Sequence, residues 1–361
     1  MEGQLEGKIG TREFFAIIII TLSMKATDNT TNLLYTIGKN AAWLVILVST
    51  VTTCIPLIII FKLVNAHKKG LIDIMHESFG KFLTWIIGIM MFIFTFASVG
   101  VNSRGYVDTM KSLYFPRTPQ LVLYIVLMGS CYIIARFGIE AIGNIAWVIL
   151  PYMALIFIIA TIFAWKYIRF EYIFPILGSG VKKIVVGGVM QSAYLNEVLT
   201  YSIIFQNVKS YKGYKAASLF GLWVSIIVMI WFFIMYVAVF DYPTVSILNF
   251  VFHTFTRFIH IVRFFQNLDA IYLTFWVLGS IVRFAAYLYT AIACLTFTFK
   301  IKNGKILLLP ISILSMIAGM LPENLFVETT WRKTLIYGST VTFFFTPIIL
   351  FVIAKFKGVK V

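Results

Sequence analysis

Apolar runs close to the length that spans a bilayer recur along the whole chain, from "FFAIIIITL" near the start to "TPIILFVIA" near the end. An apolar helix of about 20 residues crosses the hydrocarbon core of a membrane. Sixty per cent of the 361 residues are hydrophobic and 12% are charged, whereas soluble domains carry about 25% charged residues. Runs such as "IIGIMMFIFTFASVGV" do not alternate between apolar and polar residues, as transmembrane β-strands do. The sequence therefore predicts an all-α integral membrane protein.

The runs predict ten transmembrane helices in a single domain that covers residues 1–361. The predicted spans are 12–34, 41–63, 82–113, 120–135, 141–165, 185–205, 217–240, 268–298, 306–321 and 335–354. An even number of spans puts both termini on one side of the membrane. Basic residues are modestly more frequent on that side, so we expect both termini to be cytoplasmic. Arg332 and Lys333 are assigned to the outer loop before the tenth span.

Two segments outside the spans predict helices that lie on the membrane surface. "GLIDIMHESFGKFL" precedes the third span, and "ILNFVFHTFTRFIHIVRFF" precedes the eighth. Both mix apolar and charged residues at helical spacing, which is typical of interfacial helices in contact with lipid. The four histidines, which lie in loops or in these helices, are expected to face solvent or lipid headgroups: His67, His76, His253 and His260.

Several function classes find no support in the sequence. The net charge of +16 resides in short basic clusters between apolar runs, a pattern of membrane topology, so no nucleic acid partner is expected. Motifs such as the P-loop, G-x-S-x-G and H-E-x-x-H are missing, so we expect no enzyme activity. Cys54, Cys131 and Cys294 lie inside apolar runs with no metal-ligand spacing. No metal, cofactor or cleaved signal peptide is predicted.

Ionisable side chains inside membrane spans are the strongest functional candidates, because burying a charge in hydrocarbon is costly. Lys25 and Asp28 are three residues apart in the first span, so on a helix they would share a face and could pair. A structural ion pair and a later start of the span are two interpretations. The third is a broken helix whose unwound backbone faces a cavity.

Glu197 lies in the sixth span, "GGVMQSAYLNEVLTYSI", where two glycines and several polar residues weaken the helix. It could accept hydrogen bonds from the backbone or titrate a proton. Arg283 lies deep in the eighth span and needs a partner such as Glu197, Asp28 or a ligand carboxylate. Arg104 and Asp108, four apart near the end of the third span, are predicted to pair.

The two polar interruptions fall in the first and sixth spans, five spans apart. This spacing is typical of an inverted repeat of five plus five helices, in which corresponding broken helices form a central site. The repeats would cover about residues 12–165 and 185–354.

Three segments, "FPILGSGVKKI", "AYLNEV" and "LDAIYLTFWVLGSIVRFAAYLYTA", make the chain similar to a known family. It resembles the B subunits of spore germinant receptors, relatives of the amino acid–polyamine–organocation transporters. The matching residues are Pro175, Gly178 and Gly180 before the sixth span, Glu197 within it, and Leu268, Asp269, Trp276, Tyr287 and Tyr289 in the eighth.

The resemblance implies a nutrient sensor in the spore inner membrane that binds a small molecule, such as an amino acid, midway across. It also implies two partners, a membrane-embedded A subunit with a soluble domain and a lipoprotein C subunit. The ligand would contact the breaks of helices one and six and the facing parts of helices three and eight. The candidate ligand-binding residues are Met24, Lys25, Thr27, Asp28, Ser98, Val101, Gln191, Ser192, Asn196, Glu197, Gly279 and Arg283.

Two positions depart from the family pattern. Lys25 stands where the family usually has a small, glycine-bearing break, and Gln266-Asn267 stands where it usually has Glu-Arg. The Lys25 ammonium could take the place of a ligand amino group or of a coupling cation, so the ligand need not be a zwitterion. Two other functions stay open: a proton-coupled amino-acid permease, and a structural subunit whose pocket binds nothing.

Overall fold

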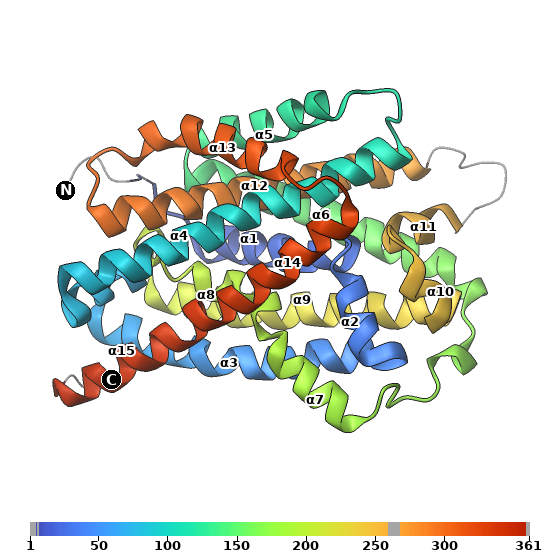
Figure 1. Cartoon of the computed structure of the whole chain (residues 1–361), viewed down its shortest axis with the longest axis horizontal. Helices are drawn as coiled ribbons and strands as arrows, with labels where there is room; N and C mark the ends of the chain where they lie inside the picture. Colours follow the sequence, from blue (N-terminus) through green and yellow to red (C-terminus); the bar gives the residue numbers. More distant parts are fainter. Residues whose placement is uncertain (1–4, 6, 259–267, 359–361) are drawn as a thin grey trace.

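The computed structural model describes residues 5, 7–258 and 268–358, and these residues are almost entirely helical (Figure 1). A single isolated bridge between Ile9 and Val208 is the β contact found among them. The elements are α1 (Thr11–Ser23), η1 (Met24–Thr27), α2 (Thr31–Gly38), η2 (Lys39–Ala41), α3 (Ala42–His67), α4 (Leu71–Leu113), α5 (Gln120–Arg136), α6 (Ile139–Ala164), η3 (Trp165–Tyr167), η4 (Phe170–Ile173), α7 (Val181–Met190), η5 (Ser192–Leu195), α8 (Glu197–Thr200), η6 (Phe205–Asn207), α9 (Tyr211–Phe240), α10 (Tyr242–Ile247), α11 (Val251–Phe258), α12 (Leu268–Phe299), η7 (Gly304–Leu307), α13 (Leu308–Met320), α14 (Leu325–Ser339), η8 (Thr340–Phe344) and α15 (Phe345–Phe356).

Six helical stretches in the described part of the chain are long and apolar enough to cross a membrane. They are 31–67, 71–113, 139–167, 211–240, 270–299 and 325–356, and two shorter apolar helices cover 120–136 and 304–320. The predicted class, an all-helical multi-pass membrane protein, is confirmed. The other spans of the predicted ten are short or interrupted: the first and sixth are broken, and α5 and α13 have 17 and 13 residues.

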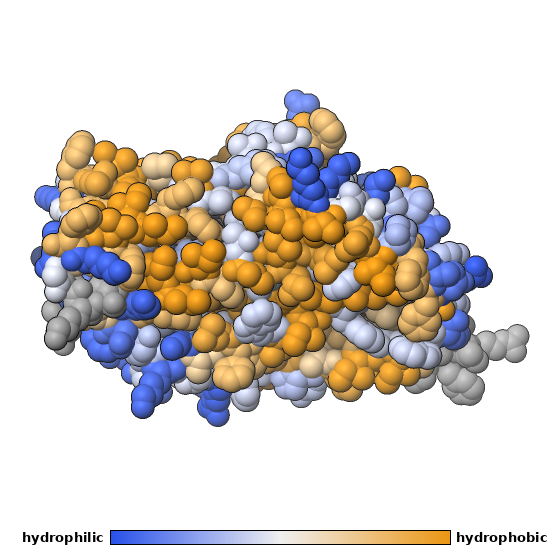
Figure 2. Space-filling model, turned by 90° about the horizontal axis from the view of Figure 1, so that it is seen from below, coloured by the Kyte–Doolittle hydropathy of each residue, from blue (hydrophilic) through white to orange (hydrophobic). Residues whose placement is uncertain are grey.

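The long helices run in roughly the same direction, and α12 and α1 lie inside the bundle (Figure 1). α12 packs against α4, α5 and α6, while α1 packs against α9 and α6. α14 packs against α4 and lies below it in the view of Figure 1. Apolar side chains cover the middle of the face in Figure 2, and hydrophilic residues gather toward its edges, as a membrane-embedded bundle requires.

The first turns of the helix predicted on the membrane surface before the third span pack against the rest of the protein. This helix forms the first turns of α4, and the backbone turns at Gly80, whose φ of 75° favours glycine. Leu71, Ile72 and Met75 are buried in the apolar core. The protein itself covers the apolar face of these first turns, whereas Phe82 and Leu83 after the turn are exposed.

The second predicted surface helix is described only as far as Phe258, and His260 and Gln266-Asn267 lie outside the described residues. In α11, His253 is buried, contrary to the prediction that it faces headgroups. Tyr114 lies 2.9 Å from its Nδ1, and Trp276 packs edge-on against its ring. α11 therefore packs its apolar face into the bundle. The side chains of Leu268 and Asp269 are likewise outside the described part.

Candidate ligand-binding cavity

The first helix is interrupted between α1 and α2. η1 has 3-10 geometry over Met24–Thr27, and the extended backbone of Asp28 separates it from α2. The Thr27 hydroxyl donates to the Met24 carbonyl at 2.7 Å, and the Asp28 carboxylate accepts the Thr30 backbone N–H at 2.9 Å. Short polar side chains form hydrogen bonds with nearby backbone groups, and these bonds compete with the hydrogen bonds of a helix. The chain is thus interrupted at the position that the sequence predicts.

Three tyrosine hydroxyls satisfy the carbonyl groups that this break exposes. Tyr106 of α4, Tyr194 of η5 and Tyr236 of α9 donate to the carbonyls of residues 24, 25 and 26, at 3.4, 3.3 and 2.9 Å respectively. Unpaired buried carbonyls are costly. These bonds therefore hold η1 in its unwound form.

The sixth span is interrupted after α7, where η5 and the short α8 replace a continuous helix. Two hydroxyls from α3 satisfy carbonyls along it: Ser49 donates to Gly188 at 2.8 Å, and Thr53 donates to Ser192 at 2.9 Å. Gly188 also allows α7 to approach α3, because a Cβ there would meet Val48 within 2.6 Å.

The two breaks face each other and are joined by Lys25. Its Nζ lies 2.6 Å from both carboxylate oxygens of Glu197, and it donates to the backbone carbonyl of Tyr194. Lys25 also lies 4.9 Å from the centre of the Tyr194 ring. Lys25 does not pair with Asp28, although the sequence allowed that pair as one possibility. The 3-10 geometry of η1 and the turn after it separate the two side chains.

Arg283 of α12 bonds Asp28 at 3.0 Å and is almost completely buried, with 1% of its surface exposed. Its guanidinium also donates to the hydroxyls of Tyr106 at 2.6 Å and Tyr287 at 3.1 Å, and Tyr287 donates in turn to Glu197. A continuous network therefore runs from one break through α12 to the other. The sequence-level expectation that Arg283 needs an internal partner is met by Asp28.

A third ion pair completes the cluster. Arg332 and Glu328, four residues apart on α14, are both buried and hydrogen-bonded to each other. Assigning Arg332 to an outer loop was wrong, because α14 begins at Leu325, ten residues before the predicted span. The i, i+4 spacing of two opposite charges in a helix was the signal that could have found it. The predicted pair Arg104–Asp108 also forms, at 2.8 Å.

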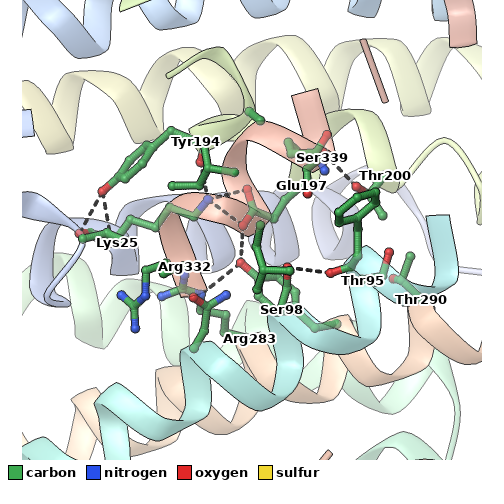
Figure 3. A pocket seen from close by; sticks show the side chains of 18 of the residues that line it. Lys25, Thr95, Ser98, Tyr194, Glu197, Thr200, Arg283, Thr290, Arg332 and Ser339 are labelled. Atoms are coloured by element: carbon green, nitrogen blue, oxygen red, sulfur yellow. Dashed lines mark hydrogen bonds and ion pairs between the residues drawn. The ribbon is translucent and has the colours of Figure 1, made fainter. Parts of the chain in front are cut away.

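These groups surround a cavity of about 70 Å³, which is space for a few water molecules. Figure 3 shows Lys25, Arg283 and Arg332 on one side of the view and the hydroxyl groups of Thr95, Thr200 and Thr290 on the other. The lining residues are Lys25, Thr30, Phe94, Thr95, Ser98, Asn102, Ala193, Tyr194, Asn196, Glu197, Thr200, Tyr201, Arg283, Tyr287, Thr290, Arg332, Leu335, Ile336 and Ser339.

Five of the sequence-level candidates line this cavity: Lys25, Ser98, Asn196, Glu197 and Arg283. The remaining seven lie around it. Asp28 is behind Arg283, and Val101, Gln191 and Ser192 are buried in the adjoining helices. Met24 and Thr27 line a smaller apolar hollow on the other side of η1, and a Cβ on Gly279 would meet Met24 there.

Sequence reasoning missed the α14 contribution and the hydroxyl-bearing wall that Thr95, Thr200 and Thr290 form. Threonines inside apolar helices commonly bond their own helix carbonyls, as Thr95 does at 2.8 Å, so they carry little signal. Among the described residues no group of three His, Cys, Asp or Glu side chains could hold a metal ion.

A profile for the family described as "Spore germination protein" matches residues 8–327. The chain belongs to the spore germination protein family. Spore germination protein KB of Bacillus subtilis (strain 168) is 22% identical over 376 residues, which covers 98% of this chain and 96% of that protein. The putative spore germination protein YfkT of the same organism is also 22% identical, with 89% of each chain covered.

Two of the three solved structures compared with this spore germination protein are transporters. MhsT in complex with L-phenylalanine has a TM-score of 0.63 at 13% identity, covering 98% of this chain and 99% of that one. The manganese transporter of Eremococcus coleocola has a TM-score of 0.65 at 12% identity, covering 97% and 82%. A nucleobase-cation-symport-1 family transporter with bromovinylhydantoin bound has a TM-score of 0.59 at 12% identity, covering 94% and 77%. At these identities the likeness shows the fold alone.

Proposed function

We propose that this chain is the nutrient-sensing B subunit of a spore germinant receptor, and that the cavity between its two broken helices binds the nutrient. The observation that carries the proposal is the family match over residues 8–327 together with a cavity built from Lys25, Glu197, Arg283 and Arg332. Buried charges inside a membrane bundle are expensive and accordingly mark ligand or ion sites.

The proposed architecture is a single domain of ten transmembrane helices arranged as two inverted repeats, 12–165 and 185–354. The interruptions at 24–30 and 191–196 support it, since each falls in the first predicted span of its half. The fold that the chain shares with two solved transporters supports it as well. Both termini would face the cytoplasm, and the membrane would be the spore inner membrane.

Signalling would follow from a population shift. A ligand biases a conformational equilibrium only through different affinities for the two states. The network from Lys25 through Glu197, Tyr287 and Arg283 to Asp28 joins both breaks to α12. A ligand that competes for one of these bonds would therefore change how the breaks are held, and the A and C subunits would respond to that change.

A germination screen tests the receptor function. Spores with and without this gene are compared across amino acids, other organic acids, sugars, nucleosides and salts. We expect the deletion to abolish the response to a defined set of nutrients and to leave the others unchanged. Identical responses of the two strains to every nutrient would overturn the proposal.

One alternative uses the same fold, a proton-coupled amino-acid permease, and the similar structure of MhsT holds L-phenylalanine. Uptake separates the two functions. The purified chain is reconstituted alone into liposomes with an inward proton gradient, and labelled substrates are added. A receptor subunit gives no accumulation, whereas a permease accumulates substrate and loses this activity when the gradient is collapsed.

A further inference from the structure

The charges that line the cavity bear on the chemical class of its ligand. Three cations, Lys25, Arg283 and Arg332, and one carboxylate, Glu197, are among the lining residues. A ligand with an ammonium group needs a free carboxylate or free carbonyl oxygens, and a ligand with a carboxylate needs free donors. The hydrogen bonds in the structure distinguish these two requirements.

The carboxylates at the cavity and the carbonyl groups of the two breaks are already engaged, whereas the amide oxygen of Asn196 has no hydrogen-bond partner in the described part of the chain. Glu197 receives Lys25 on both oxygens and Tyr287 on one of them. Asp28 receives Arg283 and the Thr30 backbone. The carbonyl of Tyr194 receives Lys25, and those of residues 24–26 receive tyrosine hydroxyls. The Lys25 ammonium thus occupies the Glu197 carboxylate, the one charged acceptor among the lining residues, which a ligand ammonium would require.

Two hydrogen-bond donors of Arg332, in contrast, have no acceptor among the described residues. Arg332 is 3% exposed, yet its Nε and Nη1 have no hydrogen-bond partner in the described part of the chain. Its Nη1 lies 3.9 Å from Asp28 Oδ1, close enough for an ion pair but too far for a hydrogen bond. Only Nη2 is used, by Glu328. Leaving two guanidinium donors buried without a hydrogen bond is costly unless an acceptor arrives from outside.

Resting on the proposed function of this cavity, we infer that its ligand is a small carboxylate without an amino group. The carboxylate accepts hydrogen bonds from Arg332, and Lys25 takes the place of the amino group that an amino acid would bring. Phe94, Leu335 and Ile336 line the cavity and suit a short aliphatic part of the ligand. The net charge of +16 adds a positive long-range potential that favours an anion.

Three molecules with one carbon skeleton test the inference. L-Lactate, L-alanine and L-lactamide are titrated into the purified full-length chain in detergent, and binding is measured by calorimetry. Lactate has the carboxylate without the ammonium, alanine has both, and lactamide has neither charge. We expect lactate to bind at least about tenfold more tightly than either of the others, because a charged hydrogen bond is worth roughly that factor.

Substitutions locate the site. Arg332→Lys keeps a cation beside Glu328 but lacks the remaining guanidinium donors, so lactate should bind about tenfold more weakly. Arg104→Lys is the matched control: Arg104 is also buried and paired at i, i+4, with Asp108, but does not line the cavity. Its lactate affinity should stay at the wild-type value. Lys25→Met frees Glu197 and should raise the affinity for alanine relative to lactate.

Each result has a defined meaning. Tighter binding of alanine than of lactate by the wild-type chain would overturn the inference and leave the proposed receptor function intact. Equal binding of lactate and lactamide would overturn the carboxylate requirement, as would equal loss of affinity in Arg104→Lys and Arg332→Lys. If none of the three molecules binds, the inference fails, and the germination screen decides the receptor function independently.

Discussion

The ammonium of Lys25 lies 2.6 Å from both carboxylate oxygens of Glu197 and joins the interruption after α1 to the interruption after α7. The two side chains come from segments 172 residues apart in the sequence. Both are largely buried, with 8% and 12% of the side-chain surface exposed. Removing one member of such a pair leaves the other charge without compensation.

Lys25→Met should therefore lower the free energy of unfolding by about 3 kcal/mol. Lys25→Met/Glu197→Gln should recover most of that loss, since an uncharged amide can still accept from Tyr287. Thermal unfolding of the purified variants in detergent checks both values. Equal destabilisation by the single and the double substitution would show that the pair has no favourable coupling. In spores, the double variant should shift the nutrient dose-response of germination at unchanged protein level.

Arg283→Lys should impair germination and lower stability by about 2 kcal/mol. Arg283 bonds Asp28, Tyr106 and Tyr287 at once, and the ammonium of lysine cannot reproduce three bonds from a planar group. Arg136→Lys, at an exposed position at the end of α5, serves as the control and should stay within about 0.5 kcal/mol of wild type. Germination and thermal unfolding are measured for both. Normal germination of Arg283→Lys would place this arginine outside the sensing mechanism.

Gly319→Ala should destabilise the packing of α13 on α4 and α5 by about 2 kcal/mol. A Cβ there would approach the Gly100 carbonyl oxygen to 2.7 Å and would also meet the Tyr124 hydroxyl, and backbone cannot yield as a side chain does. Gly129→Ala on α5 is the matched substitution, because nothing lies within 4 Å of its Cβ position. It should be neutral or slightly stabilising. Similar melting temperatures for the two variants would contradict the close approach.

Gly178→Ala should cost more stability than Gly180→Ala, by about 2 kcal/mol. Both glycines have positive φ, 42° and 93°, so alanine is strained at either position. A Cβ on Gly178 would in addition meet the Gly38 carbonyl oxygen and the Ala41 backbone, whereas nothing lies near Gly180. Comparing their melting temperatures weighs the collision at Gly178 against the backbone strain at Gly180. A loss at Gly178 no larger than the loss at Gly180 would contradict a dominant role of the collision.

The sequence alone determined the class of the protein and the positions of its interruptions. Long apolar runs require helices in a membrane, because every backbone group must be hydrogen-bonded internally there. Polar residues such as Thr27, Asp28 and Asn196 mark where the helices stop, because their side chains compete for backbone partners. Lys25, Glu197 and Arg283 stood out for the same reason, as charges inside apolar runs.

Only the tertiary structure decided which charges meet. Spacing along a helix places Lys25 beside Asp28, but the unwound backbone of η1 directs Lys25 to Glu197 and leaves Asp28 to Arg283. The sequence placed Arg332 in a loop, whereas in the structure it belongs to α14 and lines the cavity. Pairing across helices depends on packing and on helix lengths, which short-range sequence patterns do not encode. The two unused donors of Arg332, from which we infer the ligand class, are visible only once those partners are placed.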